Sequence, residues 1–214
     1  RVPYMTAPGN HDVCRWGANA GRFVDYDARN AMPWRESGAA DNGYYSFDWY
    51  RVHVTVINTE EALKLGHSRG AMKQWPKHYL NEDNVQHAWL RSDLRDAHRR
   101  RLAGELDWLV VVGHRPLYCS YVWDGCCYAR RCHANATAWA NPFRQHIEYL
   151  LRDYQVDLYL AGHTHNYERT WPVYASRLQR LDDSAAPPSP PDSDGSVPRR
   201  ATFSGWNGTI HLTV

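Results

Sequence analysis

The stretch VDLYLAGHTHNYER, residues 156–169, joins a short apolar run to a loop that carries two histidines. The apolar run is typical of a buried strand. Two more predicted strands lead into loops of the same kind: residues 2–7 (VPYMTA) precede GNHD, and residues 107–112 (DWLVVV) precede GHRP. In an open α/β sheet, loops at the carboxyl ends of the strands form the binding sites. The sequence therefore predicts one site built from three loops.

The other segments with a clear period indicate the fold class. Residues 44–60 alternate and are rich in aromatic and β-branched side chains, which predicts two strands or one bent strand. Apolar residues at helical spacing predict helices over residues 83–100 and 141–155. Asp83 or Asn84 is expected to be the N-cap of the first helix. Helices that alternate with buried strands indicate an α/β architecture.

Composition narrows the class of protein. The chain has 214 residues, 43% of them hydrophobic and 22% charged, which is typical of a globular domain. The formal net charge of +2 lacks the basic bias of a nucleic-acid-binding protein, so no nucleic acid partner is expected. No apolar stretch approaches the length of about 18 residues that spans a bilayer. Residues 181–200 are rich in Pro, Ser and Asp, and we expect a loop or a disordered insertion there.

Cysteines and glycosylation triplets favour an oxidising compartment. Four of the five cysteines crowd into one segment and are expected to form disulfides: Cys119, Cys126, Cys127 and Cys132. The fifth, Cys14, is expected to be free or to pair with a cysteine outside this chain. The triplets at Asn135 (NAT) and Asn207 (NGT) match N-glycosylation sites. Because the chain starts at Arg1, within a predicted strand, we expect a piece of a longer, secreted glycoprotein whose signal peptide is not in this chain.

The three loops offer a set of metal ligands. His163 and His165 are two apart, and extended backbone would project both rings to one side, toward one metal or two adjacent ones. Neutral imidazole is a common metal ligand. His114 adds a third imidazole nitrogen, and Asn10 offers a neutral carbonyl oxygen suited to a divalent ion. His11 would point elsewhere, where it could donate to a bound anion.

A glycine precedes the polar residues in each loop, at Gly9, Gly113 and Gly162. We expect these glycines to let the backbone turn sharply and approach a ligand closely. Taken alone, GNHD also fits a plain turn, and HTH is a weak pattern. The alternative interpretation is that these histidines are structural, within a secreted binding domain.

Together, GNHD, VVVGHRP and AGHTHNYER resemble the third, fourth and fifth sequence blocks of the calcineurin-like metallophosphoesterases. The longer stretches YMTAPGNHD, GHRPLYCS and GHTHNYERTWPVY resemble the purple acid phosphatases in particular. The cysteine-bearing segment after GHRP is similar to that of animal-type members. The resemblance covers most of residues 1–174 and returns at TIHLTV, so the chain looks like the C-terminal portion of the family's catalytic domain.

The resemblance implies a four-layer α/β/β/α sandwich, incomplete at its N-terminus, with residues 1–214 as a partial catalytic domain. It also implies a dinuclear centre of Fe(III) and a divalent ion, which is Zn, Mn or Fe. Asn10, His114 and His163 match the ligands of the divalent ion, and His165 matches a ligand of the ferric ion. His11 matches the histidine that contacts the phosphate without binding a metal.

The chain also departs from the family's pattern. The blocks D-x-G and G-D-x-x-Y, which supply two aspartates and a tyrosinate, do not occur as a pair in this sequence, and by the resemblance they belong upstream of residue 2. The chain therefore carries three of the four ligands of the divalent ion and one of the four ligands of the ferric ion. The family's histidine-rich loop, which is thought to provide an acid, is not evident either. His133 is the one candidate for that role after GHRPLYCS.

From the resemblance we expect an acid phosphatase that hydrolyses small phosphomonoesters with a metal-bound hydroxide. A phosphodiesterase or a nucleotide pyrophosphatase would use the same metal core. A further alternative is an inactive, truncated fragment. The sequence leaves the oligomeric state open.

Overall fold

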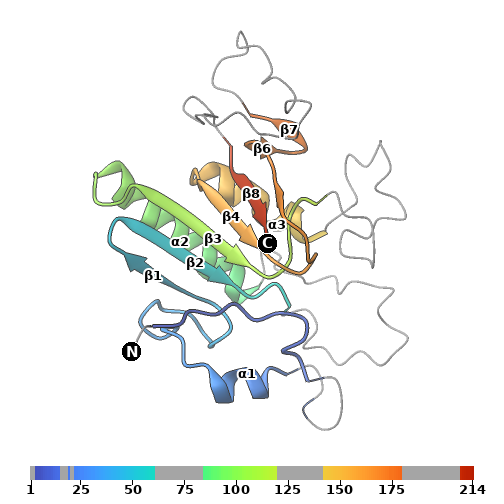
Figure 1. Cartoon of the computed structure of the whole chain (residues 1–214). Coiled ribbons are helices and arrows are strands. Elements are labelled where there is room, and N and C mark those ends of the chain that lie inside the picture. Colours follow the sequence, from blue (N-terminus) through green and yellow to red (C-terminus); the bar gives the residue numbers. More distant parts are fainter. Residues whose placement is uncertain (1–2, 15–18, 20–21, 61–83, 120–141, 180–207) are drawn as a thin grey trace.

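A computed structural model describes the chain except for residues 1–2, 15–18, 20–21, 61–83, 120–141 and 180–207 (Figure 1). Its main element is a six-stranded mixed sheet in the order β1-β2-β3-β4-β8-β5. The strands are β1 (Tyr45–Trp49), β2 (Val52–Ile57), β3 (Trp108–Gly113), β4 (Leu158–Ala161), β5 (Glu168–Arg169) and β8 (Ile210–Thr213). The strands β2, β3, β4 and β8 are parallel, and β1 and β5 are antiparallel to their neighbours. The carboxyl ends of the four parallel strands therefore meet at one end of the sheet.

Helices cover one face of this sheet. The described helices are α1 (Val24–Arg29), α2 (Val85–Leu102) and α3 (Pro142–Asp153), and a small second sheet pairs β6 (Val173–Tyr174) with β7 (Arg177–Leu178). The helices α2 and α3 pack on the same side of the main sheet (Figure 1). The core between these helices and the sheet contains fully buried side chains of α2, β3 and α3, which include Leu90, Leu94, Leu109, Val111 and Ile147. The α/β class expected from the sequence is confirmed.

The predicted helices and hairpin form where the sequence indicates. The helix α2 begins after Asn84, whose side-chain oxygen accepts a hydrogen bond from the backbone N–H of Gln86 at 2.7 Å. This cap satisfies one of the N–H groups that a helix leaves unpaired at its start. The segment 44–60 forms two antiparallel strands, β1 and β2, in register from Tyr45 opposite Val56 to Trp49 opposite Val52.

The strand expected over residues 2–7 is wrong, because residues 3–7 form no strand. The backbone oxygen of Thr6 accepts hydrogen bonds from the hydroxyls of Tyr26 at 3.1 Å and Tyr45 at 2.8 Å. Tyrosine side chains of α1 and β1 thus replace the backbone partners that a strand would require. They anchor the segment beside the sheet, so that it still leads GNHD to the end of the parallel strands.

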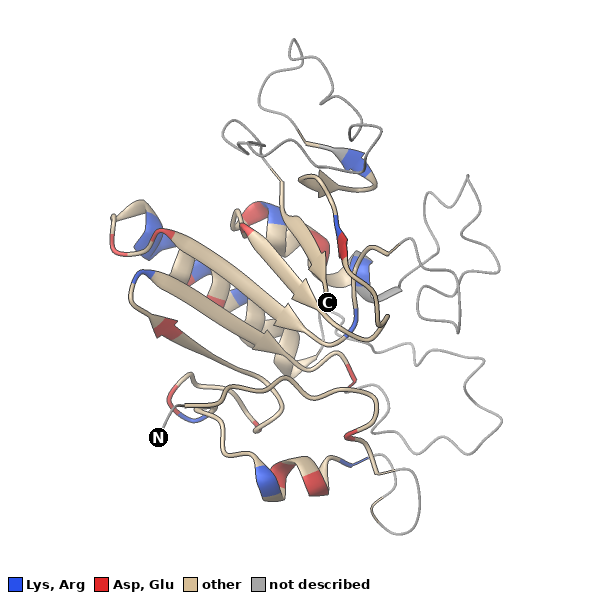
Figure 2. Ribbon diagram, in the orientation of Figure 1, with Lys and Arg blue, Asp and Glu red and all other residues tan. Residues whose placement is uncertain are grey.

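Arginines in the last turn of α2 form hydrogen bonds with residues in or next to the sheet. Arg99, Arg100 and Arg101 lie in the last turn, where cations stabilise the negative end of the helix dipole (Figure 2). Arg100 donates to Asp48 of β1 at 2.5 Å, and Arg101 donates to Asp157, just before β4, at 3.1 Å. These contacts fix the helix at the end of the sheet that lies away from the predicted site.

A buried histidine links β2 to α2 through carboxylates. The ring of His53 contacts Asp48 through Nδ1 at 2.7 Å and Asp93 through Nε2 at 3.1 Å. Asp93 also accepts hydrogen bonds from the hydroxyls of Ser46 at 2.6 Å and Thr55 at 2.8 Å. Burial by itself lowers the pKa of His53, but the hydrogen bonds and charges of Asp93 and Asp48 outweigh it, so the pKa is raised above 6.5. The charged ring, which donates from both nitrogens, suits this environment.

The His53 network predicts a pH-dependent stability. Because the folded pKa is raised, the contribution is fully present below pH 6.5, the unfolded value, and is lost as the pH rises through the folded pKa. The free energy of unfolding of the wild type, measured with urea between about pH 5.5 and 8.5, is expected to fall relative to that of His53→Gln as the pH rises. If the difference in the free energy of unfolding between the wild type and His53→Gln stayed constant over this pH range, the raised pKa of His53 would be wrong.

Two further expectations concern the whole chain. Among the described residues, none of the helices has the length and apolar character that a bilayer crossing requires. The loop or disordered insertion expected at residues 181–200 lies outside the described residues.

Candidate metal centre

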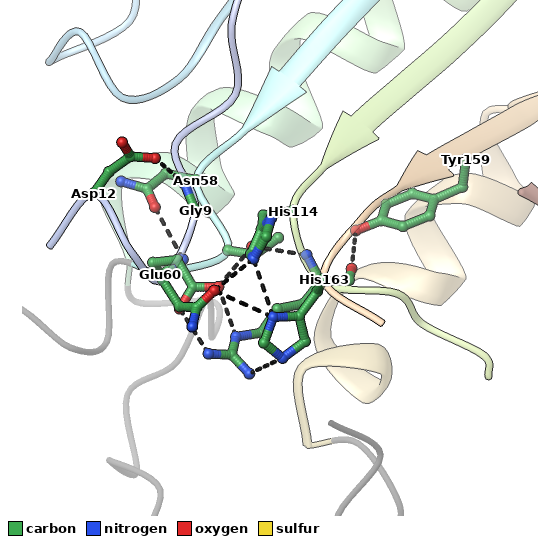
Figure 3. Close-up of polar contacts among 10 residues, drawn as sticks. Gly9, Asp12, Asn58, Glu60, His114, Tyr159 and His163 are labelled. Atoms are coloured by element: carbon green, nitrogen blue, oxygen red, sulfur yellow. Dashed lines mark hydrogen bonds and ion pairs between the residues drawn. The ribbon is translucent and has the colours of Figure 1, made fainter. Parts of the chain in front are cut away.

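Three side chains, one from each of the three predicted loops, meet beyond the carboxyl ends of β3 and β4. The Nε2 atom of His114 lies 2.7 Å from Oδ1 of Asn10 and 3.0 Å from Nδ1 of His163. The same Nδ1 atom lies 3.2 Å from Oδ1 of Asn10. The two imidazole rings point toward one another (Figure 3), with their centroids 4.8 Å apart. We call Asn10, His114 and His163 the donor trio.

Parallel pairing and a turn explain how residues so far apart in sequence converge. The strands β3 and β4 are adjacent and parallel, and the backbone N–H of Gly162 donates to the carbonyl of His114 at 3.0 Å, so the two GH loops leave the sheet side by side. GNHD forms a turn in which the N–H of Gly9 donates to the Asp12 carboxylate at 2.9 Å. The N–H of Asp12 donates to the carbonyl of Gly9 at 3.0 Å. The turn places Asn10 beside both rings. GNHD is therefore a turn, as one interpretation of the sequence had it, and it also offers a ligand, as the other had it.

The donor trio fits one metal ion. Its three donor atoms lie on a circle of radius about 1.7 Å, shorter than the metal–nitrogen distance of about 2.0–2.1 Å at zinc sites, so one ion can reach all three at once. Two imidazoles and an amide oxygen are borderline ligands that suit Zn, Fe or Mn. Among the described residues, no group of three or more His, Cys, Asp and Glu side chains is placed to hold a metal, so the amide of Asn10 is needed to complete this set.

The surroundings keep both rings of the donor trio neutral. Burial, together with the charges of Arg115, His114, His165 and His11, lowers the pKa of His163 to about 3. Burial also lowers the pKa of His114, and the charge of Glu60 opposes this effect only in part. A neutral ring has a free electron pair for a metal, so both histidines remain able to bind one in mildly acidic solution.

The backbone of the HTH segment differs from the expectation. His163 has φ of 72° and His165 has φ of 48°, so both adopt the left-handed conformation rather than an extended one. Thr164 between them is buried, whereas His165 is exposed and makes no hydrogen bond with the donor trio in the described part. The argument that extended backbone aligns the two rings is therefore wrong. Left-handed backbone is costly for a residue with a side chain, and such strain is concentrated at functional sites.

The three loop glycines matter because they lack a side chain, not because of their backbone conformation. Gly9, Gly113 and Gly162 all lie outside the left-handed region, so the turn that begins at Gly9 does not use a backbone conformation that favours glycine. Their missing side chains leave room instead. A Cβ atom at Gly9 would lie 3.0 Å from the ring of His114, and one at Gly113 would lie 2.6 Å from the hydroxyl of Tyr159. Gly9 thus lies close to a ring of the donor trio, and the expected close approach of these glycines to a ligand stays a prediction.

The remaining expected site residue of this region, His11, is exposed beside Asn10. It lies close enough for its charge to lower the pKa of both His114 and His163. It therefore lies near the donor trio.

An ion pair at the site was not predicted from the sequence. Arg115 follows His114 directly, and its guanidinium donates to both oxygens of Glu60, from Nε at 2.6 Å and from Nη2 at 2.8 Å. The Nη1 atom of Arg115 lies 3.1 Å from Nε2 of His163. Glu60, His114 and His163 lie close together in Figure 3. The available signal was position, because Glu60 follows β2, whose carboxyl end lies beside that of β3.

The cysteine and glycosylation sites are described only in part. Cys119 is disulfide-bonded, and Cys14 is a free thiol that lies 3.8 Å from a carboxylate oxygen of Asp25. The other expected residues lie outside the described part of the chain: Cys126, Cys127, Cys132, His133, Asn135 and Asn207.

Residues 1–167 match the family model described as calcineurin-like phosphoesterase. The chain is 34% identical to acid phosphatase type 7 of Danio rerio over 174 residues, which are 81% of this chain and 35% of that protein. It is 33% identical to purple acid phosphatase 23 of Arabidopsis thaliana over 174 residues, which are 81% of this chain and 31% of that protein. The chain thus spans about a third of the length of these curated relatives.

The fold is similar to that of a solved purple acid phosphatase from the seeds of yellow lupin (Lupinus luteus). The TM-score is 0.63, and the similarity covers 100% of this chain and 31% of that one. At 22% sequence identity, this likeness shows the fold alone. The mixed sheet and its helices therefore have the metallophosphoesterase fold.

Proposed function

The chain belongs to the calcineurin-like phosphoesterase family, and on this basis we propose that the full-length protein is a metal-dependent acid phosphatase that hydrolyses small phosphomonoesters. The names of its relatives support the choice of reaction, since they include an acid phosphatase and a purple acid phosphatase. Residues 1–214 would be part of the catalytic domain.

The donor trio is the observation that carries this proposal. An amide oxygen and two neutral imidazole nitrogens, contributed by segments up to 153 residues apart, converge within 3.2 Å of one another. Structural histidines are usually satisfied by hydrogen bonds to carbonyls or carboxylates. Here the ring nitrogens of His114 and His163 and the amide oxygen of Asn10 instead contact one another, and one metal ion could take the place of the proton between them.

Each residue of the site has a role in the proposed reaction. Asn10, His114 and His163 would hold the divalent ion, which is Zn, Mn or Fe, and His165 would bind Fe(III). When bound, the two metals supply an activated water molecule and stabilise negative charge on the phosphoryl group. His11, exposed beside the donor trio, would donate a hydrogen bond to the phosphate.

We further propose a secretory location for the full-length protein, with N-glycans at Asn135 and Asn207. The clustered cysteines and the disulfide at Cys119 support an oxidising compartment.

Chelation is expected to remove the activity. Dialysis of the full-length protein against a strong chelator should lower the rate of p-nitrophenyl phosphate hydrolysis at acidic pH by about 100-fold or more, because the reaction depends on metal charge. Re-addition of iron and zinc should restore the rate. The assay is the release of p-nitrophenol, with metal content measured in parallel.

A comparison of two substrates checks the reaction class. The phosphomonoester is expected to react at least about 10-fold faster than bis(p-nitrophenyl) phosphate, a diester. The reverse preference would favour a phosphodiesterase. Activity that survives complete removal of metal would reject the metal-dependent mechanism.

A further inference from the structure

The ion pair of Arg115 and Glu60 has no role in the proposed reaction so far. The side chain of Glu60 is 0% exposed, and that of Arg115 is 15% exposed. Burial of two charges is costly, and an apolar pair of the same volume would often be as stable. A buried pair beside a functional site therefore calls for a function other than stability.

The geometry of the pair fixes the direction of the guanidinium. Glu60 engages Nε and Nη2 of Arg115 with its two carboxylate oxygens, and this bidentate contact holds the planar group in one orientation. Two backbone contacts hold the segment as well. The N–H of Arg115 donates to the hydroxyl of Thr59 at 3.1 Å, and its carbonyl accepts from Tyr159 at 2.8 Å. The remaining edge of the guanidinium, with Nη1, faces His163.

The contact between Nη1 and His163 cannot persist when that ring binds a metal. Arginine only donates, so Nε2 of His163 must accept in the contact observed at 3.1 Å, and the proton of the neutral ring is then on Nδ1. Metal binding through Nδ1 requires the ring proton on Nε2 instead. Two donors would then face each other, so an oxygen acceptor between them would relieve the repulsion.

We propose that Arg115, held in place by Glu60, binds a phosphoryl oxygen of the substrate at the donor trio. This inference rests on the proposed phosphatase function. A guanidinium matches the planar spacing of phosphate oxygens better than an ammonium group does. Since Glu60 balances the charge of Arg115, the contribution is a directed hydrogen bond rather than a general attraction for anions.

The test uses the full-length protein, loaded with iron and zinc, and inorganic phosphate as the probe. Arg115→Lys keeps the charge but loses the bidentate contact, and it is expected to weaken phosphate binding and to raise KM for p-nitrophenyl phosphate by about 10-fold or more. The metal content should stay at the wild-type value. Binding is measured by calorimetry and, independently, from competitive inhibition.

A second variant guards against misfolding, because loss of Arg115 alone would leave Glu60 buried without its partner. The double variant Arg115→Met with Glu60→Gln removes both charges and is expected to lose at least as much phosphate affinity as Arg115→Lys. Arg51→Lys is the matched control. Arg51 makes the same bidentate contact with Asp107, and both nitrogen–oxygen distances are 2.7 Å. Asp107 directly precedes β3, at the end of the strand away from the donor trio. Replacement of Arg51 should therefore leave phosphate binding unchanged.

The outcomes separate the two proposals. Unchanged phosphate affinity in both Arg115 variants, with full metal content, would overturn the role of Arg115 and leave the phosphatase proposal intact. If the wild type hydrolyses no phosphomonoester, yet its phosphate affinity falls in the Arg115 variants, the phosphatase proposal fails and the anion-binding role of Arg115 stands.

Discussion

Replacement of His163 by alanine is expected to lower kcat/KM of the full-length protein by on the order of 1,000-fold and to remove about one metal ion per molecule. His163 contributes Nδ1 to the donor trio, at 3.0 Å from His114 and 3.2 Å from Asn10. Without this ring, the divalent ion loses one of the four ligands that the resemblance implies, and its binding becomes weak. Metal content by elemental analysis and the rate of p-nitrophenyl phosphate hydrolysis measure the two effects.

His98→Ala is the control for this prediction. His98 lies on α2, where its ring contacts Arg101 at 3.3 Å and packs beside Tyr154, away from the donor trio. Its replacement should leave both metal content and rate at wild-type values. If His163→Ala kept its full metal content and rate, the assignment of the donor trio as a metal site would be wrong.

The second large effect is expected for Gly113→Ala, which should lower the free energy of unfolding by about 1–3 kcal/mol. A Cβ atom at this position would lie 2.6 Å from the hydroxyl oxygen of Tyr159 and 2.9 Å from Cγ2 of Thr59. Tyr159 and Thr59 are fully buried, so neither can turn away without disturbing the core. Displacement of Tyr159 would also break its hydrogen bond to the carbonyl of Arg115. Activity should therefore fall together with stability.

Gly162→Ala provides a matched comparison, since both glycines precede a histidine of the donor trio. At Gly162 the nearest atom to a Cβ would be the backbone oxygen of Val214 at 3.5 Å, an ordinary contact. Alanine there is expected to leave stability unchanged or to raise it by about 0.4–1 kcal/mol, because it restricts the unfolded chain. Urea denaturation of both variants gives the comparison. Equal losses of stability would show that the crowding at Gly113 is not the cause.

Hydrophobic periodicity was sufficient for most elements of the fold. The alternation in residues 44–60 predicted β1 and β2, and the helical spacing predicted α2 and α3, because these patterns record which side chains face the core. It failed for residues 2–7. These residues have the composition of a strand, but the carbonyl of Thr6 accepts hydrogen bonds from two tyrosine hydroxyls instead of from a neighbouring strand. Strand formation depends on a partner backbone, which a local pattern does not specify.

The sequence alone determined the parts of the site that depend on residue type and local order. It placed Asn10, His114 and His163 in loops that follow apolar segments, and it predicted that these loops share one end of a sheet. For His114 and His163 those inferences hold because imidazole has a fixed chemistry and because the parallel strands β3 and β4 end together. Asn10 reaches the same place from residues that form no strand.

Only the tertiary structure decided which atoms meet. It placed His165 in left-handed backbone, exposed and without a hydrogen bond to the donor trio among the described residues. It also distinguished the crowded Gly113 from the open Gly162 and paired Arg115 with Glu60 across 55 residues. Such contacts depend on how segments that are remote in sequence pack together, which a local motif does not specify. The two GH pairs therefore share one role for their histidines, whereas their glycines differ in the room for a side chain because different residues pack against them.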